Sequence, residues 1–587
     1  MPQSNKVELK VVRKSAFPGK AHFSLGTAKV GSLVPIMVDE VIPNTTIDVK
    51  MAIAASLPPL ASDTFMNVDY CVEAFFVPWR LIYGGFESFF TQHPENQLYT
   101  SSSTPTINQE TFVVPRLMVS CKSGGEQDIS DVEEVLTGIH TLFDYFNAFY
   151  NPVTLTGGSD YLPVPLHLYV AYNLIWDSWY RNTLVQKSAF AKIASWNPGS
   201  APSSAPFVTL PSVNYTPTYN RIDLPDGYLA EVRDRWDSDP STLSFSDYPL
   251  ATFADGHPFW VPRQRNFGFD YFTNAWPSAQ SGNAQTVSPD SQGRISISAI
   301  RGANSFQIWE EQGQFCPRLV EAVKARYGAH LSDAIAQRPV CLGTGRYPVY
   351  SKSVDVTASN TGNINPMSST AGAQAGRAFA NGTEHIIDSF TAQEPGFIFI
   401  LGSLVPSVVY STGVDRINTR YMYNVGGQRV EMADPLLQNT GNQPIYSEEL
   451  NGTVSLYNSQ GTLNSRPVFG FTDRYADFMV KRNSVHGLMR LVSSNGQSYN
   501  LNMFAAQRAF SGQVIPVVGS AFLEIPTNYL DNVTAVRSQL SLFGYWYQCG
   551  FNYRCSMPLA QYSIPSLQNP AYEHGESVVV HRGGFRF

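Results

Sequence analysis

The stretch VDYCVEAFFVPWRLIYGGFESFF, residues 68–90, changes its periodicity at Pro78 and decides how the fold is interpreted. Up to Pro78, alternate residues fall on opposite faces of an extended chain, and this period of two predicts a strand. Beyond Pro78 the bulky residues follow helical spacing, although Gly84 and Gly85 weaken a helix. So many aromatic side chains need a large core or a partner subunit to pack against.

The composition of the 587-residue chain is typical of a β-rich protein whose outer faces are covered by other molecules. Charged residues make up 15% of the chain, against about 25% in ordinary soluble domains. Aromatic residues make up 13%, with 36 Phe and 30 Tyr. This combination favours a large assembly. The net charge of -7 argues against a protein whose whole surface grips nucleic acid, and leaves room for a local basic arm.

Strands are predicted near both ends of the chain, with helices and loops between them. Residues 33–41 and 47–53 precede the 68–77 strand, and β patterns resume from residue 349 onward. The apolar run 395–410 is interrupted by Gly402 and Pro406, so it predicts two strands joined by a bend rather than a membrane span. We therefore expect one sandwich domain over residues 1–587, with helical and loop insertions at 79–348 and C-terminal strands and a tail at 349–587.

Three helices are predicted within the insertions. The first follows a capping box of Ser130 and Glu133 and runs to residue 149. The second covers residues 165–184, and the third opens at Pro317. Residues 196–262 lack sustained periodicity and are predicted as a long surface excursion. Its aspartates do not have the spacing of an EF-hand loop, so an acidic solvated loop is favoured over a cation site; they are Asp226, Asp234, Asp237 and Asp239.

Residues 1–20 form a basic arm, which is either a solvated terminus or a contact with a polyanion. The tail, in turn, is either a DNA contact, a free end or a strand that clasps a neighbouring subunit. In a nucleic-acid contact the basic side chains would bind phosphates, and the aromatic ones would stack on unpaired bases. The candidate residues are Lys6, Lys10, Arg13 and Lys14 in the arm, and Arg582, Phe585, Arg586 and Phe587 in the tail.

Motifs of enzymes are missing from the sequence. There is no G-x-x-x-x-G-K-[ST], G-x-S-x-G or H-E-x-x-H, and the six cysteines lack C-x-x-C spacing and are predicted as buried thiols. We expect no enzyme, no cofactor and no metal. Adjacent carboxylates such as Glu448 and Glu449 leave open a β-rich polysaccharide-binding or glycoside-cleaving protein, which would usually be exported. No apolar segment of a secretory signal is visible at the N-terminus.

Seven segments, in this order, resemble the major capsid proteins of microviruses, the small icosahedral single-stranded-DNA bacteriophages, and especially the gokushovirus-like group. They are LVPIMVDEV (33–41), FFVPWRL (75–81), YNLIWDSWYRN (172–182), DYFTNAWP (270–277), QRPVCLG (337–343), SVVYSTGVDR (407–416) and FGFTDRYADFMVKRNSVHGLMR (469–490). The stretch MPLAQYSIPSL, which begins at Met557, also looks like the ending of the family.

The resemblance implies an eight-stranded viral jelly roll with long loops, assembled as a T=1 icosahedral shell around circular single-stranded DNA. It implies no catalytic residues, and a protein of the virion that is assembled in the host bacterial cytoplasm. The implied partners are other copies of the chain, the genome, a small basic DNA-condensing protein, a pilot protein and a host-surface receptor, with no membrane.

Some gokushovirus-like capsids carry a threefold protrusion inserted after the segment that matches DYFTNAWP. Here only residues 278–300 separate that segment from the next, so residues 196–262 are our candidate for the surface decoration. The aromatic cluster beyond Pro78 is our candidate for contacts between subunits. Its residues are Trp79, Arg80, Phe86, Phe89 and Phe90.

Overall fold

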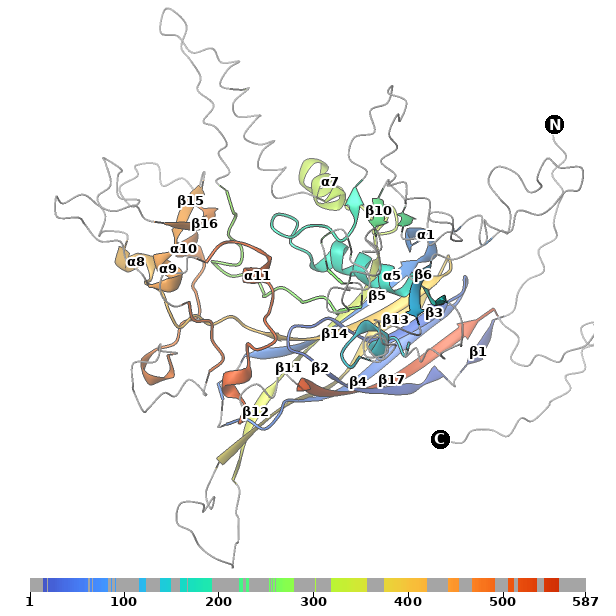
Figure 1. Ribbon diagram of the computed structural model, residues 1–587, viewed down its shortest axis with the longest axis horizontal. Coiled ribbons are helices and arrows are strands. Elements are labelled where there is room, and N and C mark those ends of the chain that lie inside the picture. Colours follow the sequence, from blue (N-terminus) through green and yellow to red (C-terminus); the bar gives the residue numbers. More distant parts are fainter. Residues whose placement is uncertain are drawn as a thin grey trace, which may run out of the picture.

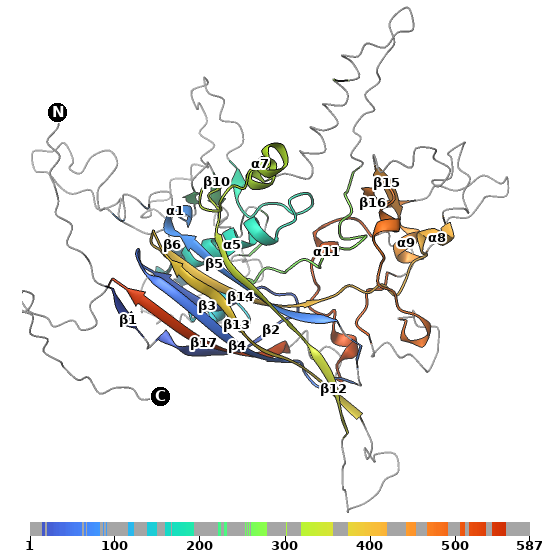
Figure 2. The ribbon, with the colours of Figure 1, turned by 180° about the vertical axis from the view of Figure 1, so that it is seen from behind.

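The chain folds into a β-sandwich with a layer of short helices on one side, shown from the front and from behind in Figures 1 and 2. The computed structural model describes residues 14–17, 20–61, 64–65, 67–82, 86, 90, 116–122, 138–148, 159–165, 167–192, 221–224, 228–231, 253, 255, 257–258, 260–278, 301, 318–355, 374–419, 442–452, 467–490, 505–510, 516–535 and 543–558. The predicted mainly β class is confirmed, and its sheets are antiparallel.

Two antiparallel sheets form the sandwich. The six-stranded sheet contains β1 (Ser15–Phe17), β2 (His22–Ala28), β4 (Thr46–Ser56), β12 (Tyr350–Asp355), β13 (Gln374–Thr391) and β17 (Tyr545–Met557). Its order is β1-β17-β4-β13-β12, and β2 also pairs with β17. The four-stranded sheet has the order β11-β5-β14-β3, from β11 (Val340–Pro348), β5 (Val68–Pro78), β14 (Gly396–Pro406) and β3 (Val34–Val41).

The main core lies between these sheets. On β4 and β17, every second side chain points inward and is buried, as the period of two requires. Tyr70 of β5 meets Tyr545 of β17 edge to face, with ring centroids 5.9 Å apart. At one edge the sheets approach so closely that a Cβ on Gly343 of β11 would lie 2.0 Å from the carbonyl oxygen of Ile386 in β13.

β5 is buried on both faces because it lies between the main core and the helical layer. Val72 and Phe76 face the main core, whereas Phe75 and Val77 belong to a second cluster beneath the helices. This layer contains α1 (Trp79–Ile82), α4 (Leu142–Tyr145), α5 (His167–Ile175) and the π-helical turn η3 (Trp176–Tyr180). The strand predicted to end at Pro78 is therefore confirmed, although the helix described after it makes only one turn.

Other sequence expectations are corrected. The run 395–410 is not two strands, because β14 continues through Gly402, whose missing Cβ makes room for the hydroxyl of Tyr70. The first predicted helix is not continuous, because His140 has a positive φ and Thr141 caps a short α4; its capping box, Ser130 and Glu133, lies outside the described residues. The third helix, α7 (Leu319–Tyr327), is present with Arg318 as its N-cap. β11 falls inside the range expected to be insertions.

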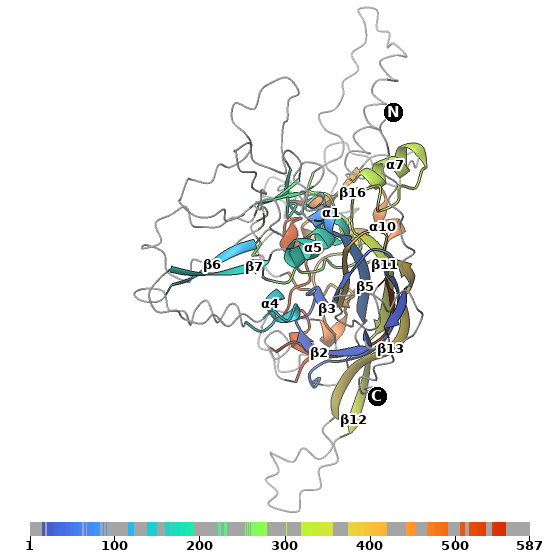
Figure 3. The same ribbon diagram turned by 90° about the vertical axis from the view of Figure 1, so that its right-hand side faces the viewer.

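Smaller elements flank the sandwich. β6 (Arg116–Lys122) pairs with β7 (Ser159–Pro165) in a ribbon that projects sideways in Figure 3. A three-stranded sheet contains β8 (Ala191–Lys192), β10 (Tyr228–Glu231) and β9 (Arg221–Leu224). Beyond one end of the sandwich in Figure 1 lie α8 (Arg416–Thr419), β15 (Asn442–Tyr446), α9 (Glu448–Asn451), β16 (Val468–Asp473), α10 (Ala476–Met479) and α11 (Ser520–Leu523). The short turns η8 (Gly487–Met489) and η10 (Asp531–Val533) belong to the same part of the sequence. Among the described helices, none is both long and apolar enough to span a bilayer.

Candidate functional site

The outward face of the six-stranded sheet is an extended surface that the described residues leave exposed. The even-numbered residues of β17 point to this face, beside residues such as Lys50 and Ala52 of β4. The helical layer lies on the other side of the sandwich (Figure 1). An antiparallel sheet with one face on the core ordinarily presents a polar second face to solvent. Here that face also carries large aromatic side chains.

These aromatic side chains form a row across neighbouring strands. The row follows the register from Trp546 on β17 through Ser56 on β4 to Phe379 on β13 and Tyr350 on β12. Trp546 is 44% exposed, Phe379 36% and Tyr350 57%. Large aromatic rings are usually buried in a folded chain. The row is therefore a candidate binding surface rather than part of the core.

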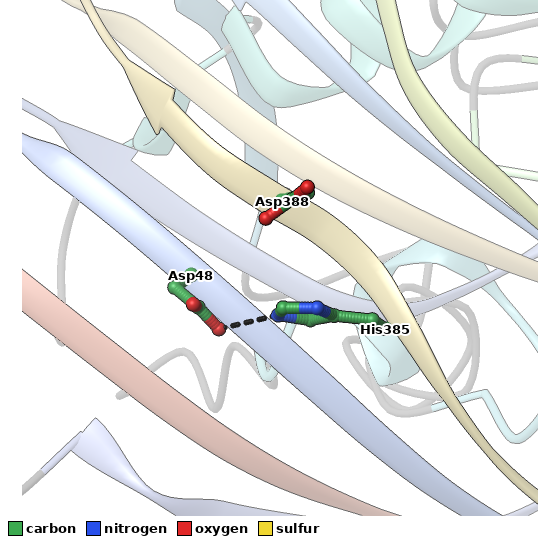
Figure 4. A group of neighbouring side chains, drawn as sticks. All are labelled: Asp48, His385 and Asp388. Carbon is green, nitrogen blue, oxygen red and sulfur yellow. Dashed lines mark hydrogen bonds and ion pairs between the residues drawn. The ribbon is translucent and has the colours of Figure 1, made fainter.

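A His–Asp cluster lies farther along the same sheet. The Nε2 atom of His385 lies 2.6 Å from Oδ1 of Asp48, and Asp388 lies close by (Figure 4). One potential ligand atom from each residue falls within 4.8 Å of the others. A His with two carboxylates has the chemistry of a transition-metal ligand set. The hydrogen bond between His385 and Asp48 already satisfies one donor and one acceptor, so the cluster also has a purely structural explanation.

A second exposed surface lies on α10, η8 and the residues between them. Phe478, Met479, Val480 and Leu488 are between 44% and 58% exposed, and we call these four residues the distal apolar surface. Large apolar side chains that remain exposed within one short segment of a chain are candidates for a contact with another protein. The surface belongs to the 469–490 segment, one of the seven segments quoted above.

Residues 263–265 tie the helical layer to the sandwich through buried arginines. The guanidinium of Arg263 donates to Asp255 and to Asn173 Oδ1, the latter at 2.7 Å, and lies 4.3 Å from the ring centroid of Trp176. Arg265 binds Glu73 at 2.7 Å, and the hydroxyl of Tyr180 donates to the same carboxylate at 2.9 Å. Buried charges persist when they are paired in this way.

Burial and neighbouring charges shift the pKa values in this layer. Burial raises the pKa of Tyr180 well above its ordinary value, and the charge of Glu73 adds to the effect. Burial lowers the pKa of His167 to about 4, and its ring packs against both Trp79 and Phe397. Burial, followed by the charge of Arg263, lowers the pKa of His257 to about 4. Each shift has a structural cause and needs no reaction to explain it.

The cluster predicted after Pro78 is divided between core and surface. Trp79 is only 8% exposed, and its ring stacks on Phe86 with the centroids 5.8 Å apart. Arg80 forms an ion pair with Glu394 at 2.7 Å. Phe90 is 59% exposed, and Phe89 lies outside the described residues. Trp79 thus packs inside its own subunit. Contacts with other subunits remain a prediction for the exposed residues of this cluster, such as Phe90.

The two predicted DNA-contact regions join the described chain at one corner of the six-stranded sheet. Most of their residues lie outside the described part, namely Lys6, Lys10, Arg13, Arg582, Phe585, Arg586 and Phe587. Lys14 is described, and its Nζ donates to Thr46 Oγ1 at 3.1 Å. Ser15 of β1 pairs with Met557 of β17, so residues 1–13 and residues 559–587 are connected to adjacent strands.

The remaining candidates that the structure describes have structural roles. The carboxylates of Glu448 and Glu449 are buried, and Glu449 accepts from the hydroxyl of Tyr271 and from Arg416, which makes a glycoside-cleaving role untenable for this pair. Asp226, Asp234, Asp237 and Asp239 lie outside the described residues. Cys71, Cys549, Cys555 and Cys341 are free thiols, and burial raises the pKa of each. They are poor nucleophiles as a result.

The aromatic row and the His–Asp cluster were missed by the sequence reasoning. Asp48 and His385 are 337 residues apart, and only the pairing of β4 with β13 brings them together. Alternation within 545–557 would have indicated that Trp546 is an outward-facing aromatic residue on a strand. No local signal pairs it with Phe379 or Tyr350.

Comparison with known proteins gives one consistent result. The family model described as "Capsid protein (F protein)" matches residues 7–567. The capsid protein VP1 of Chlamydia phage 1 is 26% identical, over 96% of this chain and 97% of the relative. The capsid protein VP1 of Spiroplasma virus 4 is 24% identical (93% and 94%), and that of Bdellovibrio phage phiMH2K is 22% identical (92% and 93%).

Proposed function

The chain belongs to the phage capsid protein (F protein) family, and from this premise we propose how it builds a particle and what the particle contains. Its role is that of a major capsid structural protein rather than an enzyme, and its copies form the shell of the virion. The finer proposal is a T=1 icosahedral shell that assembles in the bacterial cytoplasm around circular single-stranded DNA. The two sheet orders support an eight-stranded jelly roll, β2-β17-β4-β13 against β3-β14-β5-β11.

The observation that carries the assembly proposal is the distal apolar surface on a chain with few charges. Charged residues make up only 15% of the sequence, and α10 with the segment that follows exposes four apolar side chains. A shell buries such surfaces in many contacts, each weak enough to be corrected during assembly. Electron microscopy and size-exclusion chromatography of the purified chain test the proposal. Closed shells are expected, and a monomer that cleaves glycans would overturn it.

For the genome, we propose that the arm and the tail contact DNA on the same side of the subunit. The support is that both leave from the β1–β17 corner. Deleting residues 1–14 should lower the amount of DNA in purified particles, because phosphate contacts would be lost. Particles of unchanged yield and DNA content would show that the arm has another role. A small basic DNA-condensing protein and a pilot protein complete the proposed set of partners.

For host attachment, we propose that residues 196–262 supply the surface loops. The support is their length and lack of periodicity in the sequence. A density map of the particle tests this directly. The proposal requires these residues on the outer surface, where they could meet a receptor. Finding them buried beneath neighbouring subunits would reject it.

A further inference from the structure

The ribbon of β12 and β13 carries an aromatic pair and a cationic pair on one exposed face. Tyr350 lies directly opposite Phe379, and Lys352 lies directly opposite Arg377. Successive residues of a strand alternate between faces, so both pairs point the same way. All four side chains are exposed. The ribbon extends beyond the body of the sandwich in Figures 1 and 2.

The cationic pair is unfavourable in the chain alone. Like charges directly opposite each other on neighbouring strands destabilise a sheet. Within the part of the chain that the structure describes, neither Lys352 nor Arg377 takes part in an ion pair. An anion bound between the two side chains would turn this repulsion into attraction. The chemistry of the pair therefore fits a phosphate group.

The aromatic pair continues into a longer row. The register carries it from Phe379 across Ser56 of β4 to Trp546 of β17. Neighbouring strands are about 4.8 Å apart, so the backbones of Phe379 and Trp546 are separated by roughly 10 Å. Exposed rings beside cations are the two components that proteins combine to bind single-stranded nucleic acid, since unpaired bases stack on the rings while the cations hold the backbone.

We propose that this face, formed by Tyr350, Lys352, Arg377, Phe379 and Trp546, binds single-stranded DNA and lines the inside of the particle. The inference rests on the proposed enclosure of a single-stranded genome and assigns the genome a contact on the folded body, in addition to the arm and tail. The first and last strands of the chain, β1 and β17, both belong to this sheet, and they pair at the corner where the arm and the tail leave. All three contacts would then act on one side of the subunit.

The test measures binding of unassembled full-length chain to a fluorescein-labelled oligothymidylate by fluorescence anisotropy. Lys352→Gln with Arg377→Gln should weaken binding at least tenfold and make the salt dependence shallower by roughly 1.4 in the log–log slope, as expected for two lost phosphate contacts at about 0.7 each. The matched control is Lys187→Gln with Lys324→Gln. This control also removes two positive charges, but from exposed lysines outside the six-stranded sheet, and it should leave the affinity for the oligothymidylate unchanged.

A second variant tests stacking. Phe379→Ala with Tyr350→Ala should weaken binding at least fivefold. The salt slope should change little, because stacking a base on a ring releases no counterion. Shells are counted by electron microscopy for every variant. Shells that form normally while oligothymidylate affinity matches the wild type would overturn the DNA-binding face and leave the capsid role intact. Lost assembly with unchanged affinity would also overturn it, and would show that this face binds another subunit. Failure of the wild-type chain to form shells would instead count against the proposed function.

Discussion

Arg265 and Glu73 join the insertion layer to the centre of the sandwich through a buried ion pair 2.7 Å long. Both side chains are at most 15% exposed. Burial alone would lower the pKa of Arg265, but the charge of the neighbouring Glu73 carboxylate raises it above its ordinary value. The pair fixes the 260–278 segment against β5, with a further hydrogen bond from Arg265 to Ser403 at 3.0 Å.

Glu73→Gln should therefore cost about 3 kcal/mol of unfolding free energy, because it leaves the Arg265 charge buried without its partner. Urea unfolding of the unassembled chain measures the loss. Glu394→Gln is the matched control, since its ion pair with Arg80 is about one-third exposed on each side and should contribute less than about 1 kcal/mol. Equal losses in both variants would show that burial of the Glu73 pair is energetically unimportant.

Gly343→Ala should prevent the normal approach of β11 to β13. The added Cβ would lie 2.0 Å from the carbonyl oxygen of Ile386, and a backbone atom cannot move aside as a flexible side chain can. We expect a loss of more than about 2 kcal/mol. Gly268→Ala is the control because a Cβ there meets nothing within 4 Å. A melting temperature equal to that of the control would contradict the close approach.

Trp79 and Phe90 should separate folding from assembly. Trp79 is buried against Phe86 and Phe397, so Trp79→Ala should cost about 3–5 kcal/mol of folding stability. Phe90 is mostly exposed, so Phe90→Ala should leave unfolding within about 0.5 kcal/mol and reduce the yield of shells. The sequence alone predicted that Trp79 contacts neighbouring subunits. A Trp79→Ala chain that folds with wild-type stability but does not assemble would restore that role.

Assembly through the distal apolar surface predicts that Leu488→Asp folds and does not form shells. The side chain is more than half exposed, so the change should alter subunit stability by less than about 0.5 kcal/mol. A charge buried at an interface without a partner is costly. Leu488→Met keeps the apolar character and should assemble. Shells of Leu488→Asp at wild-type yield would exclude this surface from the subunit contacts.

Local patterns predicted the strands better than the contacts between them. β5 was predicted from the alternation up to Pro78, and the helix predicted over residues 165–184 corresponds to α5 followed by η3. Gly402 was interpreted as a bend because the residue that requires a glycine there is far away in the sequence. The hydroxyl of Tyr70 occupies the space that a Cβ on residue 402 would fill. The pairing of Lys352 with Arg377 could not be predicted from the sequence, because two basic residues 25 positions apart do not indicate the register of their strands. The candidate surfaces depend on such pairings.

Acid should weaken the helical layer through His167. Its pKa is lowered by burial from 6.5 to about 4. Above pH 6.5 the imidazole is neutral in both the folded and the unfolded chain, so this histidine does not make the unfolding free energy depend on pH. As the pH falls from 6.5 toward 4, the unfolded chain takes up a proton that the folded chain refuses, so stability falls. The gap between the two pKa values corresponds to roughly 3 kcal/mol.

His167→Phe should remove this part of the pH dependence and keep the stacking on Trp79, because phenylalanine has an aromatic ring and no titrating group. The measurement is the unfolding free energy of the unassembled chain at several pH values between 7 and 4. We expect the wild-type curve to fall more steeply than that of the variant below pH 6.5. Parallel curves would show that His167 is protonated in the folded chain. A residual slope in the variant is expected from His257, whose pKa is also lowered to about 4 by burial and by Arg263.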